Sequence, residues 1–102
     1  NLRSNVTDAM KAFGTLAQTA SAAGALDVKT KELIAIGISI AARCDDCIAF
    51  HVREAVHAGA TKEEIAETLA MAIYMGAGPS AMYASHAWDA YSQFAAAKAA
   101  KE

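Results

Sequence analysis

Two cysteines and a histidine lie close together in the middle of the chain. The run Cys44-Asp45-Asp46-Cys47 is followed four residues later by His51. On a helix, side chains four residues apart project from the same face, so Cys47 and His51 would be neighbours. A thiol beside an imidazole base is the combination that covalent catalysis by cysteine requires. The spacing therefore predicts a compact site for thiol chemistry.

The charges around these cysteines act in opposite directions. The pair lies where a new helix is expected to start, and the free N–H groups of a helix start stabilise a thiolate. Asp45 and Asp46 disfavour a second negative charge nearby, so the thiols need a base to ionise them. His51 is the candidate base. Glu32 is the candidate that orients it, because a chain reversal at residues 43–45 would place both on facing helices, offset by roughly 6 Å along the axis.

Two other interpretations of the cysteine pair stay open. It can be half of a zinc site, for which the ligands would be Cys44, Cys47, His51 and either Asp46 or Glu32. It can also be two small buried residues with no chemical role. Four zinc ligands from so short a stretch are hard to arrange, and no second CxxC is present. We therefore predict no bound metal and no other cofactor.

The pattern of apolar residues predicts helices throughout the chain. Alanine supplies 27 of the 102 residues and proline only one, and alanine is the best helix former. Five helices are expected at about residues 5–20, 28–43, 45–58, 61–75 and from 79 to a frayed C-terminus. Asp27 is the expected N-cap of the second, and Thr61 with Glu64 forms a capping box at the fourth. Gly59 and Gly76–Pro79 mark the helix ends that follow. We predict an all-α fold, a compact bundle of about five helices.

Length and composition set further limits. One domain over residues 1–102 is expected. The net charge is −2 and the basic residues are scattered, so no nucleic-acid partner is predicted. No apolar run approaches 18 residues, and a single CxxC pair fits the cytosol, so we expect a soluble cytoplasmic protein with no membrane partner. The chain begins with Asn1, which leaves open a longer natural start or a removed signal peptide. His57 and His86 have no thiol neighbour in sequence and are interpreted as structural.

Several spaced motifs resemble one known family. Lys31-Glu32, eleven further residues, Cys44-x-x-Cys47, three more residues and His51 resemble the active-site signature of the alkylhydroperoxidase D-like proteins, in the carboxymuconolactone decarboxylase superfamily. Downstream, His57-Ala58-Gly59-Ala60-Thr61, Glu63-Glu64-Ile65 and Glu67 resemble that family's turn and capped helix. The similarity covers about residues 26–86. It implies an all-α fold and a disulfide-forming cysteine pair that reduces peroxides.

The resemblance also implies a role for each site residue. Cys47 would attack the peroxide and Cys44 would resolve it to a disulfide, with Glu32 and His51 in a proton relay. The family's peroxidase has a histidine just before the second cysteine, where this chain has Asp46. The leading prediction is a thiol-dependent peroxidase or disulfide reductase, with a hydroperoxide substrate and a lipoyl or thioredoxin-like dithiol protein as reductant. The alternatives are a non-catalytic redox sensor or binding module, and a lactone decarboxylase, although those decarboxylases generally lack the CxxC.

Association with further copies of the chain is expected as well. An alanine-rich chain of this length leaves more apolar surface than one subunit can enclose. Composition alone favours a dimer, and the family resemblance implies a hexamer built as a trimer of dimers. The expected interface residues lie on the first helix (Met10, Phe13 and Leu16) and on the last (Tyr83, Trp88, Tyr91 and Phe94).

Overall fold

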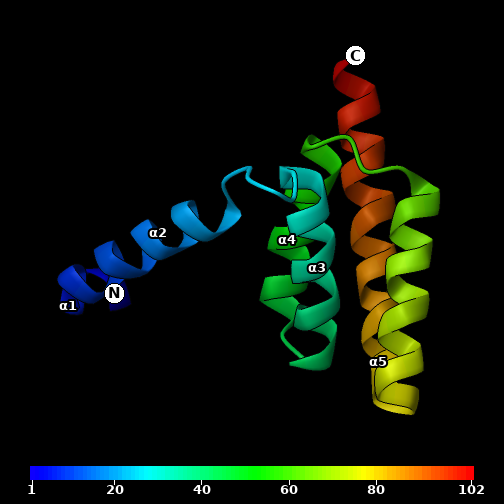
Figure 1. The fold of residues 1–102 in the computed structure, drawn as a ribbon, viewed down its shortest axis with the longest axis horizontal. Coiled ribbons are helices and arrows are strands. Elements are labelled where there is room, and N and C mark those ends of the chain that lie inside the picture. Colours follow the sequence, from blue (N-terminus) through cyan, green and yellow to red (C-terminus); the bar gives the residue numbers. More distant parts are fainter.

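The protein is all-helical. The computed structural model describes residues 1–102 and contains five helices and no strand: α1 (Leu2–Asn5), α2 (Thr7–Ser21), α3 (Val28–Ala41), α4 (Asp45–His57) and α5 (Lys62–Lys101). The helices α3 and α4 form an antiparallel hairpin that packs beside α5, whereas α1 and α2 project away from this bundle (Figure 1). None of the helices is long and apolar enough to cross a membrane.

The ends of the bundle helices follow the predicted caps. The Asp27 carboxylate accepts a hydrogen bond from the backbone N–H of Thr30 at 2.7 Å, and its hydrogen bonds to Thr30 lower the pKa of Asp27. The hydroxyl of Thr61 accepts from the N–H of Glu64, and the Glu64 carboxylate accepts from the N–H of Thr61, which completes the capping box of α5. Gly59 has a φ of +92°, so the chain leaves α4 through the left-handed region that glycine tolerates. These three predictions are confirmed.

An ion pair joins α3 to the first turn of α5. Lys29 Nζ lies 2.8 Å from a carboxylate oxygen of Glu64. The hydrogen bond from Lys29 is the main reason that the pKa of Glu64 lies below its ordinary value, and the same contact raises the pKa of Lys29. Because the pKa of Glu64 is lowered on folding, its contribution to stability is present above the ordinary glutamate pKa and is lost as the pH falls through the lowered one.

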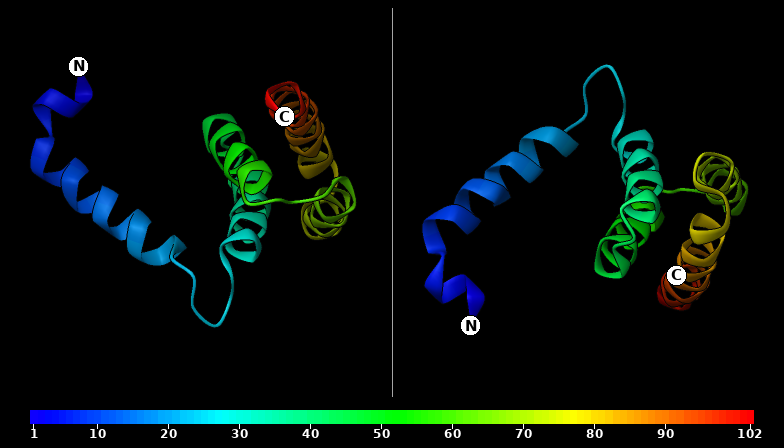
Figure 2. Two further views of the ribbon diagram at one scale, coloured as in Figure 1. Left: turned by 90° about the horizontal axis from the view of Figure 1, so that it is seen from above. Right: turned by 90° about the horizontal axis from the view of Figure 1, so that it is seen from below.

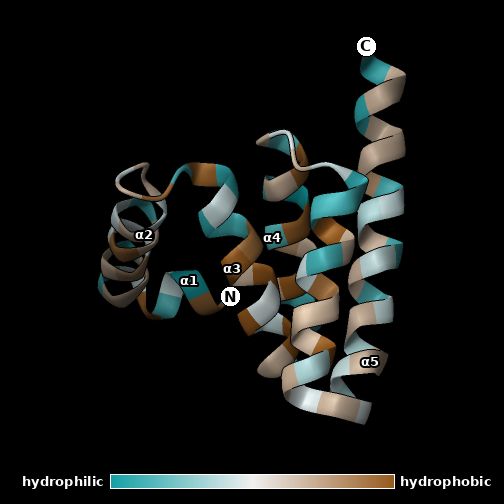
Figure 3. Ribbon diagram, turned by 45° about the vertical axis from the view of Figure 1, so that its right-hand side comes forward, coloured by the Kyte–Doolittle hydropathy of each residue, from teal (hydrophilic) through white to brown (hydrophobic).

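The core lies where α3, α4 and α5 meet. Hydrophobic residues gather along α3 and α4 in the middle of the bundle (Figure 3). The buried cluster consists of Ile36, Ile40, Ile48, Val52, Ala55, Ile65, Leu69, Ala84 and Ala87. Tyr83, Trp88, Tyr91 and Phe94 pack against this cluster from the last helical segment. These four aromatic residues therefore pack partly against the core of their own chain, and their expected place in an interface stays a prediction.

The helix α5 consists of two halves that run in opposite directions. Ala77 has non-helical angles, φ 55° and ψ −134°, and the chain turns back on itself there (Figure 1). Gly76 must lack a side chain, because a Cβ atom at this position would collide with Ser80. Pro79 stands in the first turn of the returning half, where its missing N–H is not needed. The break predicted at Gly76–Pro79 is confirmed.

The N-terminal segment differs most from the prediction. In place of one helix over residues 5–20, two helices meet at Val6, whose φ of −134° and ψ of 44° interrupt the helix. No residue of α1 or α2 is buried, and both helices lie apart from the bundle when it is viewed from above and below (Figure 2). Phe13 and Leu16 are each 62% exposed. The apolar stripe predicted for this helix therefore has no partner within the chain.

We expect the capping box to make a measurable contribution to stability. Replacing Thr61 with alanine removes the side-chain acceptor at the start of α5, which should lower the free energy of unfolding by about 1 kcal/mol. For a chain of this size that corresponds to a fall in the melting temperature of roughly 4–8 °C. Thermal unfolding followed by circular dichroism measures the change.

Thr15→Ala is the matched control for this substitution. The Thr15 hydroxyl bonds only to the carbonyl of Lys11 within α2, so its loss should leave the melting temperature nearly unchanged. Equal effects of the two substitutions would show that the cap has no special role.

Candidate thiol–disulfide site

A tight reversal between α3 and α4 positions the site. The N–H of Ala42 bonds to the carbonyl of Ile38 at 2.8 Å, and the N–H of Cys44 reaches back to the carbonyl of Ser39 at 3.1 Å. Between them, Arg43 adopts a φ of 59°, which turns the chain. The helix α3 ends at Ala41, two residues earlier than predicted, so the reversal occupies residues 42–44.

The two cysteines are joined at the start of α4. Cys44 and Cys47 form a disulfide, with their Cα atoms 5.2 Å apart. Cys44 is the N-cap of α4, and its sulfur accepts a hydrogen bond from the N–H of Cys47 at 3.1 Å. Both residues are half-buried. The sulfur of Cys44 thus lies at the positive end of the helix dipole, where a thiolate is stabilised.

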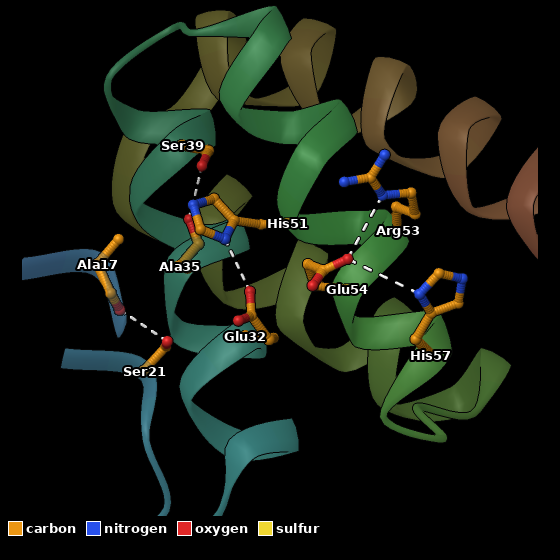
Figure 4. A network of polar contacts seen from close by, with 9 residues as sticks. All are labelled: Ala17, Ser21, Glu32, Ala35, Ser39, His51, Arg53, Glu54 and His57. Atoms are coloured by element: carbon orange, nitrogen blue, oxygen red, sulfur yellow. Dashed lines mark hydrogen bonds and ion pairs between the residues drawn. The ribbon is translucent and has the colours of Figure 1, made fainter. Parts of the chain in front are cut away.

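Glu32 and His51 contact each other directly across the helix hairpin. Glu32 Oε1 lies 2.7 Å from His51 Nδ1, without an intervening water (Figure 4). The Glu32 residue is only 6% exposed, whereas the His51 ring is partly open to solvent. An ionised carboxylate can only accept, so with Glu32 ionised, Nδ1 of His51 carries a proton and its N–H donates the hydrogen bond to Glu32. This hydrogen bond leaves Nε2 of a neutral His51 as the free basic nitrogen.

The structure brings the four predicted site residues to the same hairpin. Cys44 and Cys47 stand at its turn, and His51 lies one helical turn further along α4 from Cys47. Glu32 reaches His51 from α3. A carboxylate that orients an imidazole, next to a pair of sulfurs at a helix start, is suited to ionising a thiol and to accepting or returning its proton.

The remaining two histidines have different surroundings. His57 lies at the far end of α4, where its ring nitrogen is 3.7 Å from Glu54, which also contacts Arg53 (Figure 4). His86 lies on the second half of α5, and its Nδ1 is 2.7 Å from the carboxylate of Asp45, between the two cysteines. Reasoning from the sequence missed this contact because 41 residues separate the partners. The only signal in the sequence was the aspartate charge beside the cysteines.

No group of three or more histidine, cysteine, aspartate or glutamate side chains converges in a way that could hold a metal ion. In the disulfide form, the sulfurs of Cys44 and Cys47 are bonded to each other. The zinc arrangement considered from the sequence has no counterpart in this geometry.

The fold and the site together define a class of protein. A helical bundle with a CxxC pair at the start of one helix, and a glutamate on the preceding helix that contacts a histidine of the next, matches the alkylhydroperoxidase D-like arrangement expected from the sequence motifs. The chain belongs to the carboxymuconolactone decarboxylase family, whose sequence profile matches residues 7–90.

Individual relatives agree with this assignment. An uncharacterised protein of Cupriavidus necator is 47% identical over 79 residues, which make up 78% of this chain and 70% of that protein. The crystal structure of a carboxymuconolactone decarboxylase family protein from Legionella pneumophila has a TM-score of 0.88 at 49% identity, covering 91% of this chain and 83% of that one. A Thermotoga maritima member has a TM-score of 0.82 at 35% identity, covering 87% and 92% of the two chains, and involvement in an antioxidative response has been suggested for it.

The contact between Glu32 and His51 predicts a pH-dependent effect on thiol oxidation. Replacing Glu32 with glutamine keeps the size of the side chain but removes the charge that stabilises a protonated imidazole. We expect oxidation of the reduced cysteines at pH 7 to slow by roughly tenfold or more, and the pH profile of the rate to move to higher pH. Stopped-flow measurement of oxidation by hydrogen peroxide between pH 5 and 9 tests this.

Glu54→Gln is the matched control, because Glu54 contacts His57 on the same helix away from the cysteines. An unchanged profile in Glu32→Gln, or the same change in both variants, would relegate Glu32 to a structural role.

Proposed function

We propose that the protein is a thiol-dependent peroxidase or disulfide reductase that cycles through the Cys44–Cys47 disulfide. The observation that carries this proposal is the 2.7 Å contact between the buried Glu32 carboxylate and His51, one helical turn from a disulfide at a helix start. The family membership supports it, and so does the antioxidative role suggested for the Thermotoga maritima relative.

In the oxidative half of the cycle, His51 accepts the proton of the Cys47 thiol through Nε2. The Cys47 thiolate attacks the terminal oxygen of a hydroperoxide, so the S–O bond forms as the O–O bond breaks. The departing alkoxide takes the proton from His51 and leaves as an alcohol. Cys47 is now a sulfenic acid, which the Cys44 thiol attacks with loss of water to give the disulfide. Two electrons have moved from the cysteine pair to the peroxide.

In the reductive half, a dithiol protein returns these two electrons. A thiolate of the donor attacks the Cys47 sulfur, and the Cys44 sulfur leaves. The N–H of Cys47 points at the Cys44 sulfur, and the helix dipole favours a negative charge there, so Cys44 is the better leaving group. The second donor thiol then displaces Cys47 and closes the donor disulfide. We propose a lipoyl or thioredoxin-like protein as this donor. We also propose a cytoplasmic location.

A redox sensor that changes its binding partners is the second candidate. Asp45 and Asp46 occupy the first turn of α4, and both are exposed beside the cysteines. Their charges oppose ionisation of a thiol, and a poorly ionised thiol reacts slowly with peroxide. Slow chemistry would suit a sensor that oxidises once rather than an enzyme that turns over.

Peroxide turnover distinguishes the two candidates. We expect the wild-type protein to consume cumene hydroperoxide catalytically when dihydrolipoamide or reduced thioredoxin is supplied, and the Cys47→Ser variant to lose this activity. The Cys44→Ser variant should react once and stop, with Cys47 trapped as a sulfenic acid or a mixed disulfide that mass spectrometry detects. A wild-type protein that oxidises once but does not turn over with either donor would favour the sensor.

The exposed N-terminal helices support a further part of the proposal, which is homo-oligomerisation to a hexamer. The helix α2 leaves Phe13 and Leu16 without cover in the chain, while Met10 is partly buried. An apolar groove of about 680 Å³ lies between α3 and α5. Its lining includes Leu33, Ile34, Ile38, Met71 and Met75. Exposed apolar surface of this extent is typical of a protein that associates.

Light scattering tests the association directly. The wild-type protein at micromolar concentration should have a mass several times that of the 10.6 kDa chain. Replacing Phe13 and Leu16 with serine should reduce the mass, because the apolar face of α2 is lost. The exposed Thr15→Ala substitution on the same helix is the control. A wild-type mass near that of a single chain would refute association.

A further inference from the structure

A second imidazole–carboxylate pair flanks the disulfide. His86 Nδ1 lies 2.7 Å from Asp45 Oδ1, and this contact joins the start of α4 to the second half of α5. The rings of Tyr83 and His86 pack in a T-shaped arrangement, with centroids 5.2 Å apart. The His86 ring is thus held by an aromatic neighbour on its own helix and by a carboxylate on another.

The contact is not explained by burial. The side chain of His86 is 47% exposed and that of Asp45 is 60% exposed, so water could solvate each of them without the other. Exposed ion pairs contribute little to stability. The Asp45–His86 pair differs from other exposed ion pairs in its position, because Asp45 immediately follows Cys44 in the CxxC run. The negative charge of Asp45, which His86 can offset, therefore lies beside the two sulfurs.

We infer that His86 is a positioning residue that offsets the charge of Asp45 and so permits the cysteine pair to ionise. When the imidazole is protonated, the pair has no net charge, and one of the two negative charges that oppose a thiolate is cancelled. The inference deepens the proposed thiol chemistry, on which it rests, by assigning a regulator of the same site. With the charge of Asp45 offset, the acidic residues of the CxxC run oppose ionisation of the thiols less strongly.

No other charged side chain near the turn forms an ion pair with Asp45. Arg43 and Asp46 flank the same turn, and neither makes an ion pair within 4 Å. Asp89, one turn beyond His86 on α5, does not pair with it either. The ring of Tyr83 packs against that of His86, and a tyrosine has no cationic form that could offset the aspartate charge. His51 is engaged by Glu32, so it is not available to Asp45.

The Glu32–His51 and Asp45–His86 pairs are expected to have different roles. The Glu32 carboxylate is buried, and its contact with Nδ1 fixes the orientation of the His51 ring. The Asp45–His86 pair is open to solvent. Histidine in general is the side chain whose charge changes between about pH 5 and 8. The offset should therefore be strong at pH 6 and weak at pH 9.

Alkylation of the reduced protein tests this inference without any peroxide. The rate of reaction with iodoacetamide is measured from pH 5 to 9, with Cys44 and Cys47 followed separately by peptide mass spectrometry. We expect His86→Asn to slow alkylation at pH 6 by about three- to tenfold, which equals half to one pH unit in thiolate fraction, and to converge on the wild type at pH 9. The amide of asparagine keeps a hydrogen bond to Asp45 but carries no charge.

Two further variants identify the cause of the effect. In an Asp45→Asn background, His86→Asn should have much less effect, because there is no aspartate charge to offset. His86→Arg should restore the rate at pH 6 and hold it at higher pH, since its cation does not titrate. His57→Asn, which alters the exposed histidine at the other end of α4, is the control and should leave the rate unchanged.

Either of two results overturns the inference: wild-type alkylation in His86→Asn at pH 6, or an equal loss with and without the Asp45 charge. Circular dichroism of each reduced variant confirms that the helices are intact. Because alkylation reports ionisation alone, a protein that shows this coupling but no peroxide turnover would retain the inference and refute the proposed enzyme activity.

Discussion

The site depends on one short reversal of the chain at residues 42–44. If α3 continued straight into α4, Glu32 would lie about 18 Å from Cys44 along the helix axis. Arg43, in the left-handed region, folds the two helices against each other and brings the Glu32 carboxylate to His51. A left-handed conformation costs a residue other than glycine roughly 1–2 kcal/mol. Packing of the core residues Ile36 and Ile40 beneath the hairpin offsets this cost.

The same reversal makes Cys44 the N-cap of a new helix rather than a residue at the end of the old one. Its sulfur consequently meets free N–H groups, which favour a negative charge, instead of carbonyl groups, which would oppose it. Asp45 and Asp46 gain from the same helix dipole, since carboxylates at a helix start are stabilised. Helix stability and thiol ionisation therefore make opposing demands on these two positions, and a cation supplied from α5 is one way to reconcile them.

Much of this architecture could be predicted because local chemistry determines it. The caps at Asp27 and Thr61 and the turn at Gly59 each depend on residues within four positions of one another. The contact between Glu32 and His51 was also accessible, since two helices joined by a short turn must lie antiparallel. Contacts between distant segments were not accessible in this way. The pairing of Asp45 with His86 requires the path of α5, which no local signal in the sequence specifies.

The N-terminal segment shows a second limit of sequence reasoning. Its helical periodicity correctly indicated an amphipathic helix, but periodicity cannot say whether the apolar face packs on the same chain or on another one. The structure leaves that face uncovered. The aromatic residues of the last segment pack partly against the core of their own chain, and their expected role in an interface stays a prediction.

The disulfide closes a very small ring, since its cysteines are separated by only three positions. In the chain-entropy description, such a ring restricts the unfolded chain by only about 2 kcal/mol, compared with almost 5 kcal/mol for a loop of a hundred residues. Gaining or losing two electrons thus shifts the folding equilibrium of the bundle by less than half as much as it would across a loop of a hundred residues. The small size of the ring therefore limits how far the oxidation state of Cys44 and Cys47 alters the stability of the bundle.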